Sequence, residues 1–133
     1  MLPRILILSG EAEHRHKLSG VMPSCGWVPI HCETISAAMG LLMRYQIEVI
    51  VCDEVLPDGD FRELMKELKR SACEALVVVM SRSYDWGDYL GAMIAGAYDY
   101  LAYPPYPGEL EEVVAAALVE TRARRKVPLQ TAA

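Results

Sequence analysis

Short apolar runs alternate along this chain with longer segments in which apolar residues recur every three or four positions. Five of the short runs have the length and β-rich composition of buried strands: residues 4–8, 27–31, 47–52, 75–80 and 98–102. A segment with helical spacing follows each of them: 11–22, the stretch that begins at Thr34, 60–70, 84–95 and 107–126. Because 75–80 is apolar at every position, we expect it to be a central strand covered on both faces.

Alternation of this kind predicts an α/β domain with a doubly wound parallel sheet and helices on both faces. A length of 133 residues is that of a single domain. We assign 1–126 to this domain and 127–133 to a C-terminal tail or the start of a linker. Ligands of such sheets bind at the carboxyl ends of the strands. The residues just after each predicted strand are therefore the first candidates for a site.

Charge and hydropathy exclude several classes of partner. Thirteen basic and eighteen acidic residues give a net charge of −5, which argues against direct binding of nucleic acid. The longest apolar run, 113–119, is too short to cross a membrane, and the first residues lack the layout of a signal peptide. The four cysteines form no C-x-x-C pair. We therefore expect a cytoplasmic protein. No glycine-rich nucleotide-binding motif follows any of the predicted strands.

Two segments carry a resemblance to a known family. Asp53 ends the third predicted strand and opens Asp-Glu-Val-Leu-Pro-Asp-Gly-Asp at 53–60, and Gly-Ala-Tyr-Asp-Tyr-Leu-Ala-Tyr-Pro occupies 96–104. In this order they resemble the receiver domains of bacterial two-component response regulators, of the chemotaxis-regulator-like kind, over nearly the whole chain. The resemblance implies five strands in the flavodoxin-like order 2-1-3-4-5 with five helices. It also implies a signalling role and no enzymatic one.

The resemblance further implies that Asp53 is a phosphoacceptor, which receives a phosphoryl group from a histidine kinase with the help of Mg²⁺. Ser81 matches the hydroxyl that binds the phosphoryl oxygens, and Ser81 and Tyr100 match the switch positions. Ser9 and Gly10, however, stand where the family has two acids that hold the metal, and Tyr103 stands where it has a lysine.

These departures remove positive charge from the predicted phosphate pocket, which is made of Ser9, Gly10, Glu11, Ser81, Arg82 and Tyr103 around Asp53. Transfer of a phosphoryl group to a carboxylate depends on neutralising charge, and one charge pair at about 4 Å is worth roughly 4 kcal/mol near a protein surface. We therefore expect slow or absent phosphorylation. We expect no cofactor and no tight metal, with at most weak binding of Mg²⁺.

Two side chains of this pocket, Arg82 and Asp53, can each be interpreted in two ways. Arg82 either pairs with Asp53 as a built-in cation or points to solvent. Asp53 is either the inherited phosphoacceptor position or an ordinary turn residue.

The two histidines His14 and His16 lie two positions apart, a spacing that points them to different faces of a helix, whereas a helical pair of metal ligands lies three or four positions apart. We interpret both as part of a solvated stretch.

A partner surface is predicted on the fourth helix and the fifth strand. Trp86, Tyr89 and Met93 form one apolar stripe, expected to face outward beside Tyr100. A second stripe at core spacing is made of Leu90, Ile94 and Ala97. The alternative is that both stripes pack internally. Expected partners are a histidine kinase or another signalling protein, or a second copy of the chain through this surface.

The leading hypothesis is thus a degenerate receiver domain that acts through phosphate-independent protein interactions. One alternative is a working phosphoacceptor that uses Glu11, Asp53 and Mg²⁺. Another is a small-ligand protein that binds an anion at the helix start formed by residues 9–11.

Overall fold

In the computed structural model, which describes residues 1–126, five parallel strands form one sheet in the order β2-β1-β3-β6-β7. This is the predicted order, and each strand lies within two residues of its predicted position: β1 (Arg4–Leu8), β2 (Val28–Cys32), β3 (Val49–Asp53), β6 (Leu76–Ser81) and β7 (Asp99–Ala102). A short antiparallel pair, β4 (Val55–Leu56) and β5 (Gly59–Asp60), was not predicted. The predicted tail, 127–133, lies outside the described residues.

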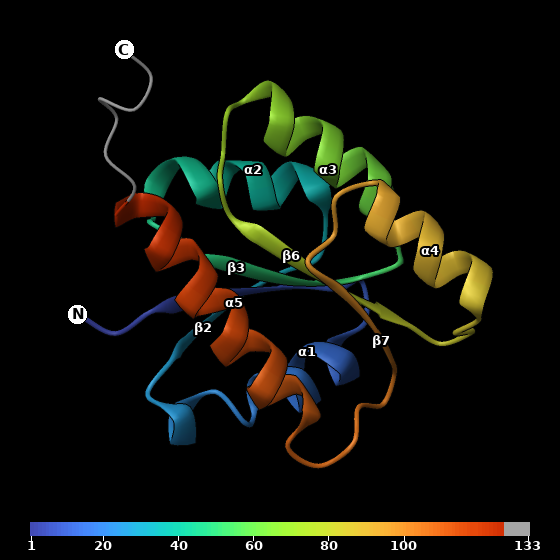
Figure 1. Ribbon diagram of the computed structural model, residues 1–133, viewed down its shortest axis with the longest axis horizontal. Coiled ribbons are helices and arrows are strands. Elements are labelled where there is room, and N and C mark those ends of the chain that lie inside the picture. Colours follow the sequence, from blue (N-terminus) through green and yellow to red (C-terminus); the bar gives the residue numbers. More distant parts are fainter. Residues whose placement is uncertain (127–133) are drawn as a thin grey trace.

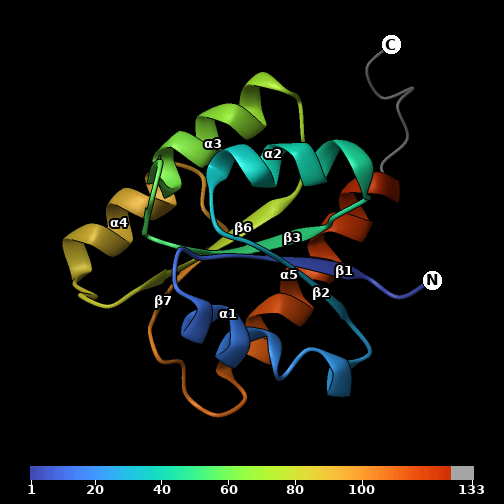
Figure 2. The same cartoon turned by 180° about the vertical axis from the view of Figure 1, so that it is seen from behind.

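Five helices cover the two faces of the sheet: α1 (Ala12–Ser19), α2 (Ile35–Arg44), α3 (Phe61–Arg70), α4 (Trp86–Ile94) and α5 (Glu109–Lys126). Figure 1 shows α2, α3 and α4 on one face and α1 and α5 on the other, and Figure 2 shows the same layers from behind. α1 ends three residues before its predicted end, and a short 3-10 turn, Pro23–Cys25, follows. Within 1–126, no helix combines the length and the apolar character needed to cross a bilayer.

Alternation along the strands builds a core on each face. Leu6 and Leu8 of β1 pack with α2 and α3, whereas Ile5 and Ile7 pack with α1 and α5. The central strands β3 and β6 are buried at every residue, which confirms the prediction of a strand covered on both faces for β6. The sheet therefore holds the residues at its carboxyl edge on a rigid base.

The outward face of α4 differs from the prediction. Its exposed apolar residues are Trp86, Leu90 and Ile94, at 67%, 42% and 87% exposure. Tyr89 packs instead against the core, at an edge-to-face angle to Tyr100. The cause is a small residue, the fully buried Ala92, because it lets the helix approach the sheet on the side that also carries Tyr89.

The predicted outward stripe is therefore wrong in part. Trp86 faces solvent as expected, but Tyr89 and Met93 are half-buried. Leu90 and Ile94, which were expected to face the core, are exposed, while Ala97 is buried as predicted. Tyr100 is 1% exposed and cannot form part of an exposed surface.

Candidate functional site

Residues from four parallel strands meet at the carboxyl edge of the sheet. Asp53 is the last residue of β3 and Ser81 the last of β6, while Ser9 and Tyr103 follow β1 and β7 directly. This is the edge at which parallel sheets bind ligands. A cavity of about 160 Å³ opens there, lined by His14, Asp53, Glu54, Val55, Met80, Arg82, Ser83 and Tyr103.

The Asp53 carboxylate is buried and already has two hydrogen-bond partners. The Ser9 hydroxyl lies 2.5 Å from Oδ2, and Nδ1 of His14 lies 3.2 Å from Oδ2 and 3.4 Å from Oδ1. Ser9 is itself fully buried, so its hydroxyl is not available to an anion at the start of α1. Asp53 is thus more than a turn residue, because its side chain is the centre of a polar cluster.

The interpretation of His14 as a solvated residue is wrong, although His16 is exposed as expected. His14 is buried, and its ring stacks on Tyr103 with 3.9 Å between the ring centroids. Sequence spacing contained a signal for this position, since His14 lies four residues before the buried Leu18 and therefore shares its helix face. His14 is a site residue that sequence reasoning missed.

Arg82 is exposed, as one of its two interpretations predicted, but its guanidinium is bonded to other side chains. Its Nη2 atom makes a short contact with Oε2 of Glu11 and lies 2.8 Å from Nε2 of His14. The guanidinium is therefore not free in solvent, and its contacts are with Glu11 and His14, so the predicted direct pair with Asp53 is wrong. The hydrogen bond to Arg82 lowers the pKa of Glu11, and the same bond raises the pKa of Arg82.

These contacts assign the neutral ring of His14 one tautomer. Because Arg82 donates to Nε2, that nitrogen accepts, and Nδ1–H donates to Asp53. The positive charge of Arg82 is thus linked to the Asp53 carboxylate through a neutral imidazole. Arg, His and Asp form a continuous hydrogen-bonded chain across the candidate pocket.

Two residues that depart from the family pattern, Tyr103 and Gly10, pack closely against neighbouring side chains. Tyr103, at the position of the family lysine, holds the ring of His14 by stacking. Gly10, at one of the two acid positions, lies against Pro57: an added Cβ would be 2.9 Å from Cγ of the proline. An acidic side chain at position 10 would therefore require Pro57 to move.

A second polar cluster joins the two predicted switch residues. The Ser81 hydroxyl lies 3.1 Å from Oε1 of Glu54, and the Tyr100 hydroxyl donates to Oε2 of the same carboxylate at 2.7 Å. Burial raises the pKa of Tyr100 to about 12. Sequence reasoning missed Glu54, because nothing in the pattern separates a turn glutamate from one that binds two hydroxyls.

The metal that the family pattern implies is Mg²⁺, and the residues present do not fit it. Glu11, His14 and Asp53 can each offer one ligand atom within 4.8 Å of the others. Mg²⁺ requires an octahedral set of oxygens, whereas this set includes an imidazole nitrogen, and the Glu11 carboxylate is bonded to a guanidinium.

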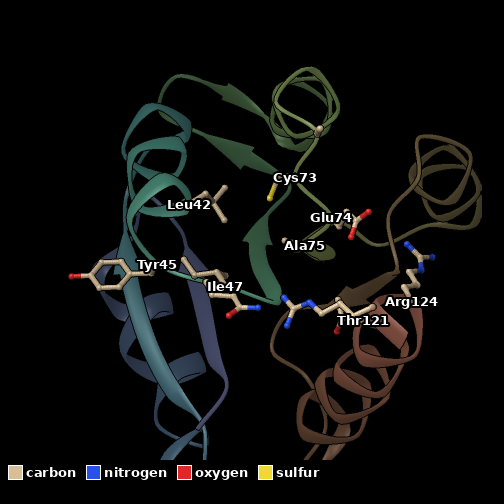
Figure 3. Close-up of a pocket in the computed structure, with 11 residues that line it drawn as sticks. Leu42, Tyr45, Ile47, Cys73, Glu74, Ala75, Thr121 and Arg124 are labelled. Atoms are coloured by element: carbon tan, nitrogen blue, oxygen red, sulfur yellow. The ribbon is translucent and has the colours of Figure 1, made fainter. Parts of the chain in front are cut away.

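A second cavity, of about 270 Å³, lies at the amino ends of β3 and β6, far from Asp53. Figure 3 shows Leu42 and Tyr45 on the side of α2 and Thr121 and Arg124 on α5. The lining of this cavity shares no residue with the cluster around Asp53. The two cavities are therefore separate features at opposite edges of the sheet.

Comparisons with known proteins place this geometry in context. No protein-family model matches the chain. The KDP operon transcriptional regulatory protein KdpE of Escherichia coli (strain K12) is 29% identical over 117 residues, which cover 88% of this chain and 52% of KdpE. The phosphate regulon transcriptional regulatory protein PhoB of the same strain is 30% identical over 112 residues, or 83% of this chain and 49% of PhoB. The chain thus spans about half the length of these curated relatives.

A solved structure shows the same fold. The response regulator receiver domain protein from Clostridium thermocellum superposes with a TM-score of 0.82 at 18% identity, covering 92% of this chain and 98% of that one.

Proposed function

The chain belongs to the receiver domains of response regulators, and from that premise we propose that it is a degenerate receiver. In this role it engages a partner signalling protein without phosphorylation of Asp53. The observation that carries the proposal is the hydrogen-bonded chain from Arg82 through His14 to Asp53.

Both oxygens of the Asp53 carboxylate face groups of the protein itself, Ser9 and His14. A carboxylate attacks a phosphoryl group only where cations draw the two anions together. Here the Arg82 guanidinium is bonded to the carboxylate of Glu11 and separated from Asp53 by the His14 ring. The pocket favours an unmodified aspartate over an acyl phosphate.

The switch residues support the same proposal. In the family pattern the hydroxyl at position 81 binds the phosphoryl oxygens, but here it donates to the carboxylate of Glu54. Tyr100 is buried, and its hydroxyl donates to the same Glu54 carboxylate. The two residues that would respond to phosphorylation are already held by an anion of the protein.

The exposed apolar stripe of α4, made of Trp86, Leu90 and Ile94, supports an interaction role. Tyr84 and Tyr106 are also exposed and line a cavity of about 440 Å³ between α4 and the residues after β7. We propose this corrected surface as the docking face for a partner, either a histidine kinase, another signalling protein or a second copy of the chain.

Intact mass after incubation with acetyl phosphate and Mg²⁺ tests the proposal. We expect no added mass, because the pocket lacks the cations that stabilise the transfer. Appearance of about 80 Da in the wild type, absent from Asp53→Asn, would instead establish the working phosphoacceptor. A receiver domain with both acids and the lysine, treated in the same tube, shows that the donor is active.

A further inference from the structure

We propose that Glu11 and His14 form a binding site for a divalent transition-metal ion such as Zn²⁺. In this site Asp53 orients the His14 ring, and the Arg82 guanidinium competes with the metal for the same two ligand atoms. The inference rests on the proposed function in one respect: Asp53 must keep its free carboxylate to hold His14.

A metal-bound imidazole binds the ion through one nitrogen and donates a hydrogen bond from the other, and the two nitrogens of His14 are placed for these two roles. A histidine that ligates a metal usually donates its other ring N–H to a carboxylate, and Nδ1 of His14 faces Asp53 in this way. Nε2 faces Oε2 of Glu11 at 3.5 Å. Two ligands of a tetrahedral Zn²⁺, each bonded at about 2.0–2.1 Å, lie about 3.4 Å apart. The pair therefore has the separation of two zinc ligands.

A positive group already lies between these two atoms. Nη2 of Arg82 contacts both Oε2 of Glu11 and Nε2 of His14. The Arg82 side chain is 61% exposed and its ion pair is with an exposed carboxylate, so a metal that takes over both Glu11 and Nε2 of His14 displaces an ion pair of small net worth. Arg82 thus marks where a cation is stabilised and can leave that position.

The surroundings suit an ion that accepts nitrogen and keeps bound water. The cavity of about 160 Å³ beside His14 and Asp53 has room for water ligands. Stacking on Tyr103 limits rotation of the His14 ring, which keeps Nε2 directed toward Glu11. Because one donor is an imidazole, the site selects Zn²⁺ or Co²⁺ over Mg²⁺.

Titration of the full chain with Co²⁺, followed by visible absorption and by displacement with Zn²⁺, tests the site. We expect one equivalent to bind and an excess of Mg²⁺ not to compete. Arg82→Ala should bind roughly fivefold to tenfold tighter, because it removes the competing exposed ion pair. Glu11→Gln and His14→Gln should lose the signal, while His16→Gln, an exposed histidine on the same helix, should retain it.

Three results would overturn the site: no saturable signal in either the wild type or Arg82→Ala, weaker binding in Arg82→Ala, or unchanged binding in Glu11→Gln or in a folded His14→Gln variant. Binding at the half-buried thiols of Cys25 and Cys73 would show cobalt–thiolate charge transfer and would survive these substitutions. If His14→Gln does not fold, Glu11→Gln decides, since Glu11 is exposed. Phosphorylation of Asp53, read by mass, would refute the proposed function while leaving this metal titration interpretable.

Discussion

Replacement of His14 with alanine should lower the free energy of unfolding by about 2–4 kcal/mol, as measured by urea denaturation. The variant loses a hydrogen bond to the charged Asp53, a kind of bond worth about 1.5–3 kcal/mol, and the carboxylate stays buried with Ser9 as its remaining partner. It also loses the stack on Tyr103, which adds about 0.5–1.5 kcal/mol.

His16→Ala is the matched control for this variant. His16 lies on the same helix but is exposed, so its replacement should change stability by less than about 0.5 kcal/mol. Equal effects of the two substitutions would mean that His14 is not the buried partner of Asp53.

Tyr100 should make the protein lose stability between about pH 10 and pH 12. Burial raises the pKa of Tyr100 from 10.0 to about 12 in the folded protein, so the fold favours the neutral phenol. Below pH 10 both states hold the proton and the contribution to stability is complete. As the pH rises toward 12, the unfolded chain loses the proton first, which removes about 1.4 kcal/mol for each pKa unit of difference, or about 2–3 kcal/mol in all.

Urea denaturation across this pH range, with wild type and Tyr100→Phe side by side, isolates the contribution of Tyr100. The phenylalanine variant keeps the ring but has no proton to lose, so the difference between the two proteins should shrink as the pH rises. Buried thiols such as Cys32 titrate equally in both proteins and cancel. Tyr84→Phe, at an exposed tyrosine, is the control: its free energy of unfolding should change with pH in parallel with that of the wild type. Parallel curves for Tyr100→Phe would contradict the buried phenol.

The order of strands and helices could be predicted from sequence because buried strands and amphipathic helices each impose a period on the chain. Thr34 is an example of a local signal that sequence alone reveals. Its hydroxyl accepts a hydrogen bond from the backbone N–H of Ala37, and α2 begins where this cap predicted. By contrast, β4 and β5 contain two residues each, which is too few to show the alternation of apolar and polar residues that marks a strand.

The site was predictable only in part. The edge of the sheet and the positions of Asp53, Ser81 and Tyr103 follow from the topology. The partners of Arg82 do not, because Glu11 and His14 are 71 and 68 residues away and their contact depends on how α1 is placed. The face that α4 turns outward also depends on tertiary packing, since both of its stripes have helical spacing.

The most direct measurement of whether the Asp53 pocket can hold a phosphoryl-like group is ¹⁹F NMR of the full chain with beryllofluoride and Mg²⁺. With Ser9 and His14 on the carboxylate and Arg82 bonded to Glu11, only signals of free beryllofluoride should appear. Bound signals in slow exchange that disappear in Asp53→Asn would contradict the degenerate receiver, because they would mean that the pocket accepts both the phosphoryl mimic and the metal.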